Sequence, residues 1–222
     1  LEGGRVSQGE QAGGEAPGYL APTVMIVDDD TMVRGAMDSL FRSIGLQTLL
    51  FDSAQALLDH PLPAGPSCLV VDVRLPRMSG MEIQAKLAER GDRAPIIFMS
   101  GHGDIAMSVR AMKAGAVDFL AKPFRDQDII DAVLAALDRD RDRLATEGAL
   151  EAASRRHAAL TRRETEVMAL VVAGLMNKQI ASELGISEIT VKMHRGTMMK
   201  KMGVRTVADL VRIAAIVNRR PP

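Results

Sequence analysis

The sequence is poor in cysteine and in aromatic residues. Cys68 is the only cysteine among 222 residues, tryptophan is absent, and aromatic residues make up 3% of the chain. A single cysteine excludes an intrachain disulfide, which is usual in a reducing cytosol. Its place inside an apolar run predicts a small buried side chain. We therefore expect a cytoplasmic protein without a disulfide framework.

Long apolar runs are also absent. No stretch approaches the roughly 18–20 apolar residues that a membrane-spanning helix requires, so we expect no membrane partner. Residues 1–21 are rich in Gly, Glu, Gln and Ala and lack an apolar signal core, and we expect a disordered extension without a function of its own. The hydrophobic fraction of 47% is ample for the cores of two modest domains.

The net charge of zero conceals two oppositely charged halves. Residues 155–222 hold 13 Lys and Arg against 5 Asp and Glu, a balance of +8. Residues 1–154 hold 15 against 23, a balance of −8, and the two parts add to the totals of 28 and 28. Charge blocks can simply solvate a surface, but two opposed blocks indicate different partners, with a polyanion such as nucleic acid for the second.

The first half consists mainly of short apolar runs, and the segments between them have the apolar periodicity of helices. The runs comprise residues 23–27, 46–51, 68–71, 96–99 and 117–121. Continuous runs of this length are typical of parallel strands buried on both faces, and five strand–helix units predict a doubly wound α/β domain over residues 22–138. In such sheets ligands bind beyond the carboxyl ends of the strands.

Polar residues end four of these runs and form one chemical set. Asp72 stands alone at the end of its strand and is the predicted nucleophile for a phosphoryl group. Asp28 and Asp29 are predicted to hold Mg²⁺, which prefers oxygen ligands and retains water. Lys122 can pair with Asp72 and then with phosphate, and the Ser100 hydroxyl can bond a phosphate oxygen.

These residues resemble the receiver domain of response regulators. The motifs are VDDD (27–30), Asp72 with LP (75–76) and MSG (78–80), MSGHG (99–103) and AKPF (121–124). The resemblance implies a flavodoxin-like five-stranded parallel sheet. It also implies that Phe119 is the switch aromatic, that the backbone carbonyl of Arg74 is a further Mg²⁺ ligand, and that Lys122–Pro123 is a cis peptide. Ser100 stands where many relatives have Thr, which keeps the hydroxyl. Taken one at a time, Asp30 is expected to cap a helix and Phe119 is as well explained by core packing.

The second half contains only helical signals. Residues 139–159 lack a strong apolar stripe and are predicted to be a linker, helical in part. From residue 160 to 220 we expect four helices, with capping at Thr161, Asn177, Ser187 and Thr206 and a tight turn at Gly185. Two short helices joined by such a turn form a helix-turn-helix.

This half resembles the LuxR-type DNA-binding domain. The motifs are LTRRE (160–164), GLMNKQIA (174–181), LGIS (184–187) and TVKMHR (190–195). With the receiver, the chain resembles a two-component response regulator of the NarL/FixJ family, nearest the FixJ branch.

The third helix of this half is the expected recognition helix. Val191, Met198 and Met202 share its buried side, whereas Lys192 and Met193 lie on the opposite side, where they can contact bases in the major groove. The remaining candidates for DNA contact are Lys178, Thr190, His194, Arg195 and Lys200. His194 is equally explained as a structural histidine, and Lys200 as a cation that offsets the helix dipole.

The resulting hypothesis is a phosphorylation-dependent transcriptional regulator. A sensor histidine kinase donates phosphate to Asp72, the protein forms a homodimer, and it binds a pseudo-palindromic promoter site, with RNA polymerase as a candidate partner. It is not an enzyme beyond weak self-dephosphorylation. Leu210, Ile213 and Val217 are candidate dimer contacts or part of their own core. One alternative is a Mg²⁺-dependent phosphohydrolase. Such an enzyme would need a second acidic residue, as general acid, just after the nucleophile Asp72, and Arg74 stands there instead. The other alternative is a regulator with the same fold that needs no phosphorylation.

Overall fold

We describe the protein from a computed structural model, which covers residues 20–101 and 105–218. The chain divides into two compact units, Leu1–Arg141 and Asp142–Pro222. Most of the extension expected at residues 1–21 lies outside the described residues, and so do residues 102–104, which include the last two residues of the MSGHG motif. No helix within the described ranges combines the length and apolar character needed to cross a membrane.

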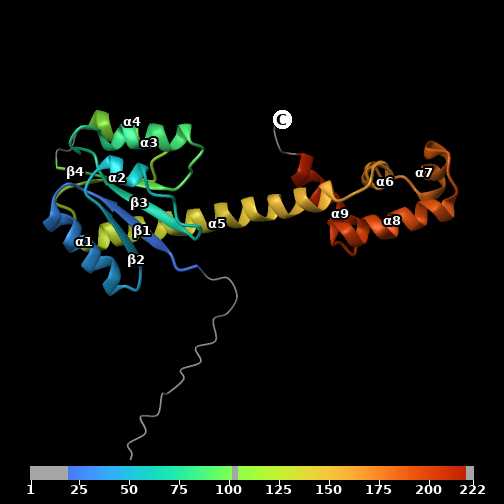
Figure 1. Ribbon diagram of the computed structural model, residues 1–222, viewed down its shortest axis with the longest axis horizontal. Coiled ribbons are helices and arrows are strands. Elements are labelled where there is room, and N and C mark those ends of the chain that lie inside the picture. The colour runs from blue at the N-terminus through green and yellow to red at the C-terminus, as the bar shows by residue number, and fades with distance from the viewer. Residues whose placement is uncertain (1–19, 102–104, 219–222) are drawn as a thin grey trace, which may run out of the picture. The chain divides into compact units, whose positions relative to one another are not determined.

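The first unit is built on a five-stranded parallel sheet in the order β2-β1-β3-β4-β5, which confirms the predicted fold (Figure 1). The strands are β1 (Thr23–Val27), β2 (Gln47–Phe51), β3 (Ser67–Asp72), β4 (Ile96–Ser100) and β5 (Asp118–Ala121). Every residue of β1 and β3 is buried, because helices cover both faces of the central strands. Cys68 is a buried residue of β3, and burial raises the pKa of its thiol.

Two layers of helices cover this sheet. Helix α1 (Thr31–Ser43) and the first part of α5 (Asp126–Ala158) pack on one face, and α2 (Ala54–Leu58), α3 (Gly80–Glu89) and α4 (Ile105–Lys113) pack on the other (Figure 1). Asp30 caps α1 by accepting from the backbone N–H groups of Met32 and Val33, as predicted. Ser79 forms a capping box with Glu82 and so begins α3, the helix that follows the strand end at Asp72.

Helix α5 is longer than expected, because the predicted linker is helical through Ala158. Oppositely charged residues one turn apart stabilise this stretch, including Arg143 with Glu147 at 2.6 Å and Arg155 with Glu151 at 3.3 Å. Asp140, also beyond the expected end of the receiver, is buried and accepts from the backbone N–H of Ser67 at 2.9 Å. Residues 138–143, whose charges alternate in sign, thus continue the helix, and the helical part of the predicted linker covers nearly all of it.

The second unit has the predicted all-helical architecture. Beyond the end of α5 it contains α6 (Arg162–Val172), α7 (Asn177–Leu184), α8 (Glu188–Met202) and α9 (Val207–Asn218). Thr161 and Ser187 cap α6 and α8, and Gly185 adopts the left-handed conformation that the turn after α7 requires. The predicted cap at Asn177 is wrong. Asn177 is the first residue of α7, and the residue at the capping position is Met176. The side-chain oxygen of Asn177 accepts a hydrogen bond from Arg195 at 2.9 Å instead of capping the helix.

Candidate functional site

Four polar residues lie together at the carboxyl edge of the sheet because of strand register. Val27 pairs with Val71, so Asp28 leaves β1 beside Asp72 at the end of β3. Asp72 pairs with Met99, and Ser100 at the end of β4 pairs with Ala121, the residue before Lys122. Because the strands are parallel, the carboxyl ends of β1, β3, β4 and β5 lie at the same edge of the sheet, as expected from the sequence.

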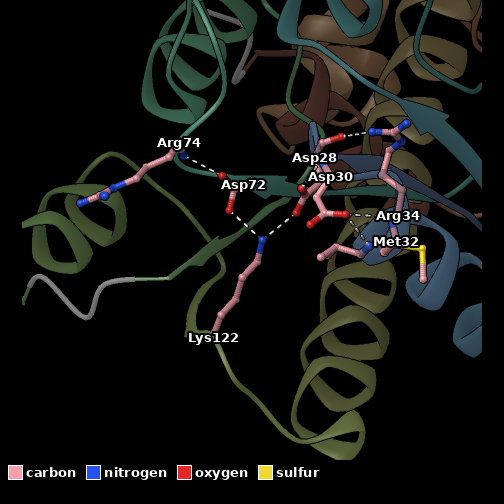
Figure 2. A network of polar contacts seen from close by, with 8 residues as sticks. Asp28, Asp30, Met32, Arg34, Asp72, Arg74 and Lys122 are labelled. Carbon is pink, nitrogen blue, oxygen red and sulfur yellow. Dashed lines mark hydrogen bonds and ion pairs between the residues drawn. The ribbon is translucent and has the colours of Figure 1, made fainter.

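The centre of this edge is the ammonium group of Lys122. Its Nζ lies 2.6 Å from Asp28 Oδ2 and 2.9 Å from Asp72 Oδ1, and it donates to both (Figure 2). Asp28 is 1% exposed and Asp72 is 7% exposed, so little solvent screens this attraction. One cation therefore neutralises part of the charge of two buried carboxylates.

Backbone groups satisfy the remaining oxygens of the two carboxylates. Asp28 Oδ1 accepts from the N–H of Asp30 at 3.0 Å, and Asp72 Oδ2 accepts from the N–H of Arg74 at 2.9 Å. Figure 2 shows the side chain of Arg74 directed away from Asp72. All four carboxylate oxygens thus accept a hydrogen bond, so burial leaves none of them without a partner.

The two carboxylates change the acidity of the lysine between them. Burial disfavours the charged ammonium and lowers the pKa of Lys122, but the hydrogen bonds and attraction from Asp28 and Asp72 outweigh it. The net effect raises the pKa above its ordinary value of 10.5. Lys122 therefore carries a positive charge at neutral pH.

Asp29 does not join this cluster, so the expectation that three carboxylates converge is wrong. Successive residues of an extended chain point to opposite sides, and Asp28 is buried whereas Asp29 is exposed. Asp29 instead lines a pocket with Asp52, Ser53 and Arg77. Within residues 20–101 and 105–218, no three His, Cys, Asp or Glu side chains lie close enough to share a metal ion.

The donor set nevertheless fits magnesium. Mg²⁺ binds to oxygen through one or two carboxylates and keeps several of its waters, so it needs no third side chain. Asp28 and Asp72 supply carboxylate oxygens that lie within hydrogen-bonding distance of the same Lys122 ammonium, and the Arg74 backbone lies beside Asp72, to which its N–H donates. The site therefore has the chemistry that the sequence predicts, with fewer carboxylates.

The two expected signalling residues occupy different environments. Ser100 is 1% exposed at the end of β4, one position past the strand partner of Asp72. Phe119 is half-buried in β5 and packs against the apolar cluster that contains Val73 and Leu75. The peptide bond between Lys122 and Pro123 is cis, which confirms the expectation from the resemblance.

Gly80 is a further residue of the site whose reason the sequence did not reveal. A β-carbon at this position would lie 2.7 Å from the Asp72 carbonyl oxygen, 3.0 Å from Val71 and 3.1 Å from Phe98. Its N–H also donates to the Val73 carbonyl at 3.0 Å. Helix α3 can therefore begin against the strand end only because this residue has no side chain.

The second candidate site lies on α7 and α8. Among the predicted DNA contacts, Lys178, Lys192, Lys200 and Met193 have exposed side chains. Thr190, His194 and Arg195 are half-buried. The Thr190 hydroxyl bonds that of Ser187, and Arg195 donates to Asn177, so these two side chains also stabilise the helix-turn-helix itself.

Three residues outside the predicted DNA contacts have structural roles. Lys201 donates to Glu164 at 2.7 Å and joins α8 to the start of α6. Leu210 is completely buried in the core of the second unit, and Ile213 packs against that core. The interpretation of Leu210 and Ile213 as part of their own domain's core is therefore the right one, and the exposed large hydrophobic residues of α9 are Val211 and Ile216.

Known proteins match the chain over both units. Residues 24–134 match the response regulator receiver domain, and residues 158–214 match the luxR family of bacterial regulatory proteins. Nodulation protein W of Bradyrhizobium diazoefficiens is 50% identical, over 91% of this chain and 89% of its own length. The chain belongs to the NarL/FixJ family of response regulators.

Further relatives agree with this assignment. The transcriptional regulatory protein FixJ of Azorhizobium caulinodans is 42% identical, over 89% of this chain and 94% of its own. The solved structure of the response regulator StyR is 45% identical, with a TM-score of 0.83, and the match covers 88% of this chain and 99% of StyR. The protein is therefore a response regulator of a two-component system, in which phosphorylation of a receiver controls transcription through a DNA-binding domain.

Proposed function

We propose that Asp72 of this response regulator accepts a phosphoryl group from a sensor histidine kinase. The observation that carries the proposal is the position of Lys122 Nζ, within hydrogen-bonding distance of Asp28 and Asp72 at once. Asp72 is the member of this pair at the strand end that the α3 N-terminus approaches. A carboxylate held beside a fixed cation is suited to become an acyl phosphate.

The transfer conserves atoms and charge. A carboxylate oxygen of Asp72 attacks phosphorus, and the bond from phosphorus to the donor imidazole nitrogen breaks. The electron pair stays on the imidazole, which leaves as a neutral ring if its other nitrogen is protonated. The new acyl phosphate carries more negative charge than the carboxylate, and Lys122 remains to neutralise part of it.

Magnesium is the proposed cofactor. Asp28 and Asp72 would hold it directly, with the Arg74 backbone carbonyl. When bound, the ion offsets the repulsion between the incoming phosphoryl group and the carboxylates.

Ser100 and Phe119 are proposed to transmit the change. Ser100 would move to bond a phosphate oxygen. Phe119 of β5 and Met107 of α4 pack against the same apolar cluster. A shift of Phe119 would then alter the surface of α4 and β5.

The output is proposed to be a homodimer that binds a pseudo-palindromic promoter site through two recognition helices, with RNA polymerase as a further partner. We infer a cytoplasmic location, because kinase, promoter and polymerase meet there. We also infer that the protein is not an enzyme toward other molecules and at most hydrolyses its own acyl phosphate slowly.

The test is incubation of the full chain with acetyl phosphate and Mg²⁺, followed by intact mass, oligomeric state and affinity for promoter DNA. Wild type is expected to gain one phosphoryl group, dimerise and bind DNA more tightly. Asp72→Asn is expected to do none of these. Glu89→Gln, which removes the same charge from an exposed site at the end of α3, is the matched control and is expected to behave as wild type.

A wild type that gains no phosphoryl group and still binds DNA tightly contradicts the proposal and favours a regulator triggered by dimerisation or a ligand. A phosphoryl group found on Asp72→Asn places the acceptor elsewhere. Continuous release of phosphate from a phosphorylated small molecule, at a rate unaffected by DNA, favours a phosphohydrolase.

A further inference from the structure

Helix α8 carries apolar side chains on two opposite sides. On one side Val191, Met198 and Met202 are completely buried in the domain core. On the other, Ile189 is 83% exposed and Met193 is 61% exposed, and neither packs against that core. Ile189 is the most exposed large hydrophobic residue in the part of the chain that the structure describes. Packing within the domain therefore does not explain the apolar character of this second side.

The exposed apolar residues belong to one narrow strip. With about 100° between successive residues of an α-helix, positions 189, 192, 193, 196 and 200 fall within roughly 100° of one another. Besides Ile189 and Met193, the strip contains Lys192, Gly196 and Lys200, all exposed. We call these five residues the recognition strip. It lies opposite the buried side of the helix.

The charge of the strip indicates what covers it. Its two ionisable residues, Lys192 and Lys200, are both cationic, and they alternate with apolar side chains along the helix. An apolar protein surface would leave both ammonium groups without a partner, whereas duplex DNA offers phosphates and guanine acceptors. The only apolar group on a base edge in the major groove is the 5-methyl group of thymine.

Gly196 leaves the middle of the strip open. A β-carbon built there has no other atom within 4 Å, so no neighbouring side chain fills that space. The base-contacting groups are therefore displaced toward the N-terminal half of the helix, where Ile189 and Met193 lie one turn apart. Four residues of helix span about 6 Å, which is close to two base-pair steps of about 3.4 Å each.

We propose that Ile189, together with Met193, contacts thymine methyl groups, and that each half-site contains two thymines spaced accordingly. The inference rests on DNA binding by α8, which the proposed function also requires, and adds Ile189 as a residue that determines base preference. Lys192 then has the role of contacting a guanine or phosphate between or beside the two thymines.

The experiment begins with selection of a binding site from randomised duplexes by the full-length protein treated with acetyl phosphate and Mg²⁺. Each thymine of the selected site is then replaced in turn by deoxyuridine, which lacks only the methyl group. Affinity is measured by fluorescence anisotropy for wild type, Ile189→Ala and Met193→Ala. Val211→Ala, an exposed apolar residue of α9 outside the strip, is the matched control.

Loss of one contacted methyl group is expected to weaken binding by wild type about fourfold. In Ile189→Ala one of the two sensitive thymines is expected to become insensitive to deoxyuridine, and in Met193→Ala the other. The Val211→Ala protein is expected to keep both sensitivities. Because Ile189 is almost fully exposed, its truncation is expected to leave the circular dichroism spectrum unchanged.

Three results would overturn the inference alone. They are a selected site without thymine in the half-sites, equal deoxyuridine effects in wild type and Ile189→Ala, or an Ile189→Ala protein that changes only in dimerisation. The last result would assign Ile189 to a contact between protein chains. Failure of wild type to select any duplex would instead contradict the proposed function.

Discussion

At the scale of single residues, the acidic site depends on one cation. Asp28 and Asp72 are both buried, and their mutual repulsion is relieved by the ammonium group of Lys122, which contacts both. Replacement of Lys122 by methionine keeps most of the volume but leaves two neighbouring carboxylates without that charge. We expect the free energy of unfolding to fall by about 1 kcal/mol at neutral pH, a modest value because the lysine is partly exposed.

The stabilisation of the folded protein by Lys122 depends on pH. The pKa of Lys122 is raised in the folded protein, so its stabilisation is complete below the ordinary value of 10.5 and is lost as the pH rises through the folded-state pKa. The stability difference between wild type and Lys122→Met is therefore expected to shrink above pH 10.5. Urea denaturation in magnesium-free buffer below and above that pH measures it, and a difference that grows at high pH contradicts the assignment.

Gly80 provides a second prediction at this scale. The Gly80→Ala substitution places a methyl group 2.7 Å from the Asp72 carbonyl oxygen, so we expect a loss of about 1–3 kcal/mol in the free energy of unfolding. Gly35→Ala is the matched control, because Gly35 lies within α1 with no atom within 4 Å of the added carbon. Gly35→Ala should raise the free energy of unfolding by about 0.5–1 kcal/mol. If both variants lose the same amount of stability, the close approach of the Asp72 carbonyl to Gly80 is not the cause.

At the scale of elements, the pair formed by Glu164 and Lys201 joins the start of α6 to the end of α8. The hydrogen bond from Lys201, followed by that from the Thr161 N–H, lowers the pKa of Glu164 below its ordinary value of 4.5. The recognition strip therefore lies on a helix whose C-terminal end is held to α6 by this ion pair, in addition to the apolar core that contains Met198 and Met202.

This contact predicts a pH-dependent link between the helices. The stabilisation by Glu164 is present above its unfolded pKa and is lost as the pH falls through the lowered folded-state pKa. Hydrogen exchange at neutral pH should therefore be faster in α6 and α8 of Glu164→Gln than of wild type, and the difference should disappear in acid. Glu183→Gln, an exposed residue of α7, is the control, and equal exchange in both variants would exclude the proposed link.

At the scale of the whole molecule, charge is divided between the two halves of the sequence, with a balance of −8 in residues 1–154 and +8 in residues 155–222. This division separates an acidic site that needs cations from a surface that meets a polyanion. Association with DNA should therefore be strongly salt-dependent, because bound phosphates release counterions.

The salt dependence predicts different effects for two lysines. Lys178 is exposed on α7 and is a predicted phosphate contact, so Lys178→Ala should reduce the slope of log affinity against log salt by about 0.9 and weaken all sequences alike. Lys192→Ala should instead change the relative affinity for different sequences. Titrations at several salt concentrations with specific and unrelated duplexes measure both, and an unchanged slope for Lys178→Ala would remove this residue from the phosphate contacts.

The sequence by itself determined the order of the elements and the residues at their ends. Buried parallel strands are continuous apolar runs, so Asp72, Ser100 and Lys122 could be assigned to one edge of a sheet before any coordinates were known. Helix caps such as Asp30 and Thr161 were also predictable, because a cap bonds backbone groups only two or three residues away.

Only the tertiary structure decided which neighbours come into contact. Asp28 is buried, whereas its neighbour Asp29 is exposed. Asn177 accepts a hydrogen bond from Arg195, and Lys201 donates to Glu164, 37 residues away in the sequence. The tertiary structure also buried Leu210 and left Ile189 exposed, although both are large aliphatic residues in helices. The physical reason is the sequence distance over which each interaction acts. Strands and helix caps depend on periodicity and on hydrogen bonds between residues close in the sequence. The direction and pairing of side chains depend on atoms that the packing of distant elements brings together.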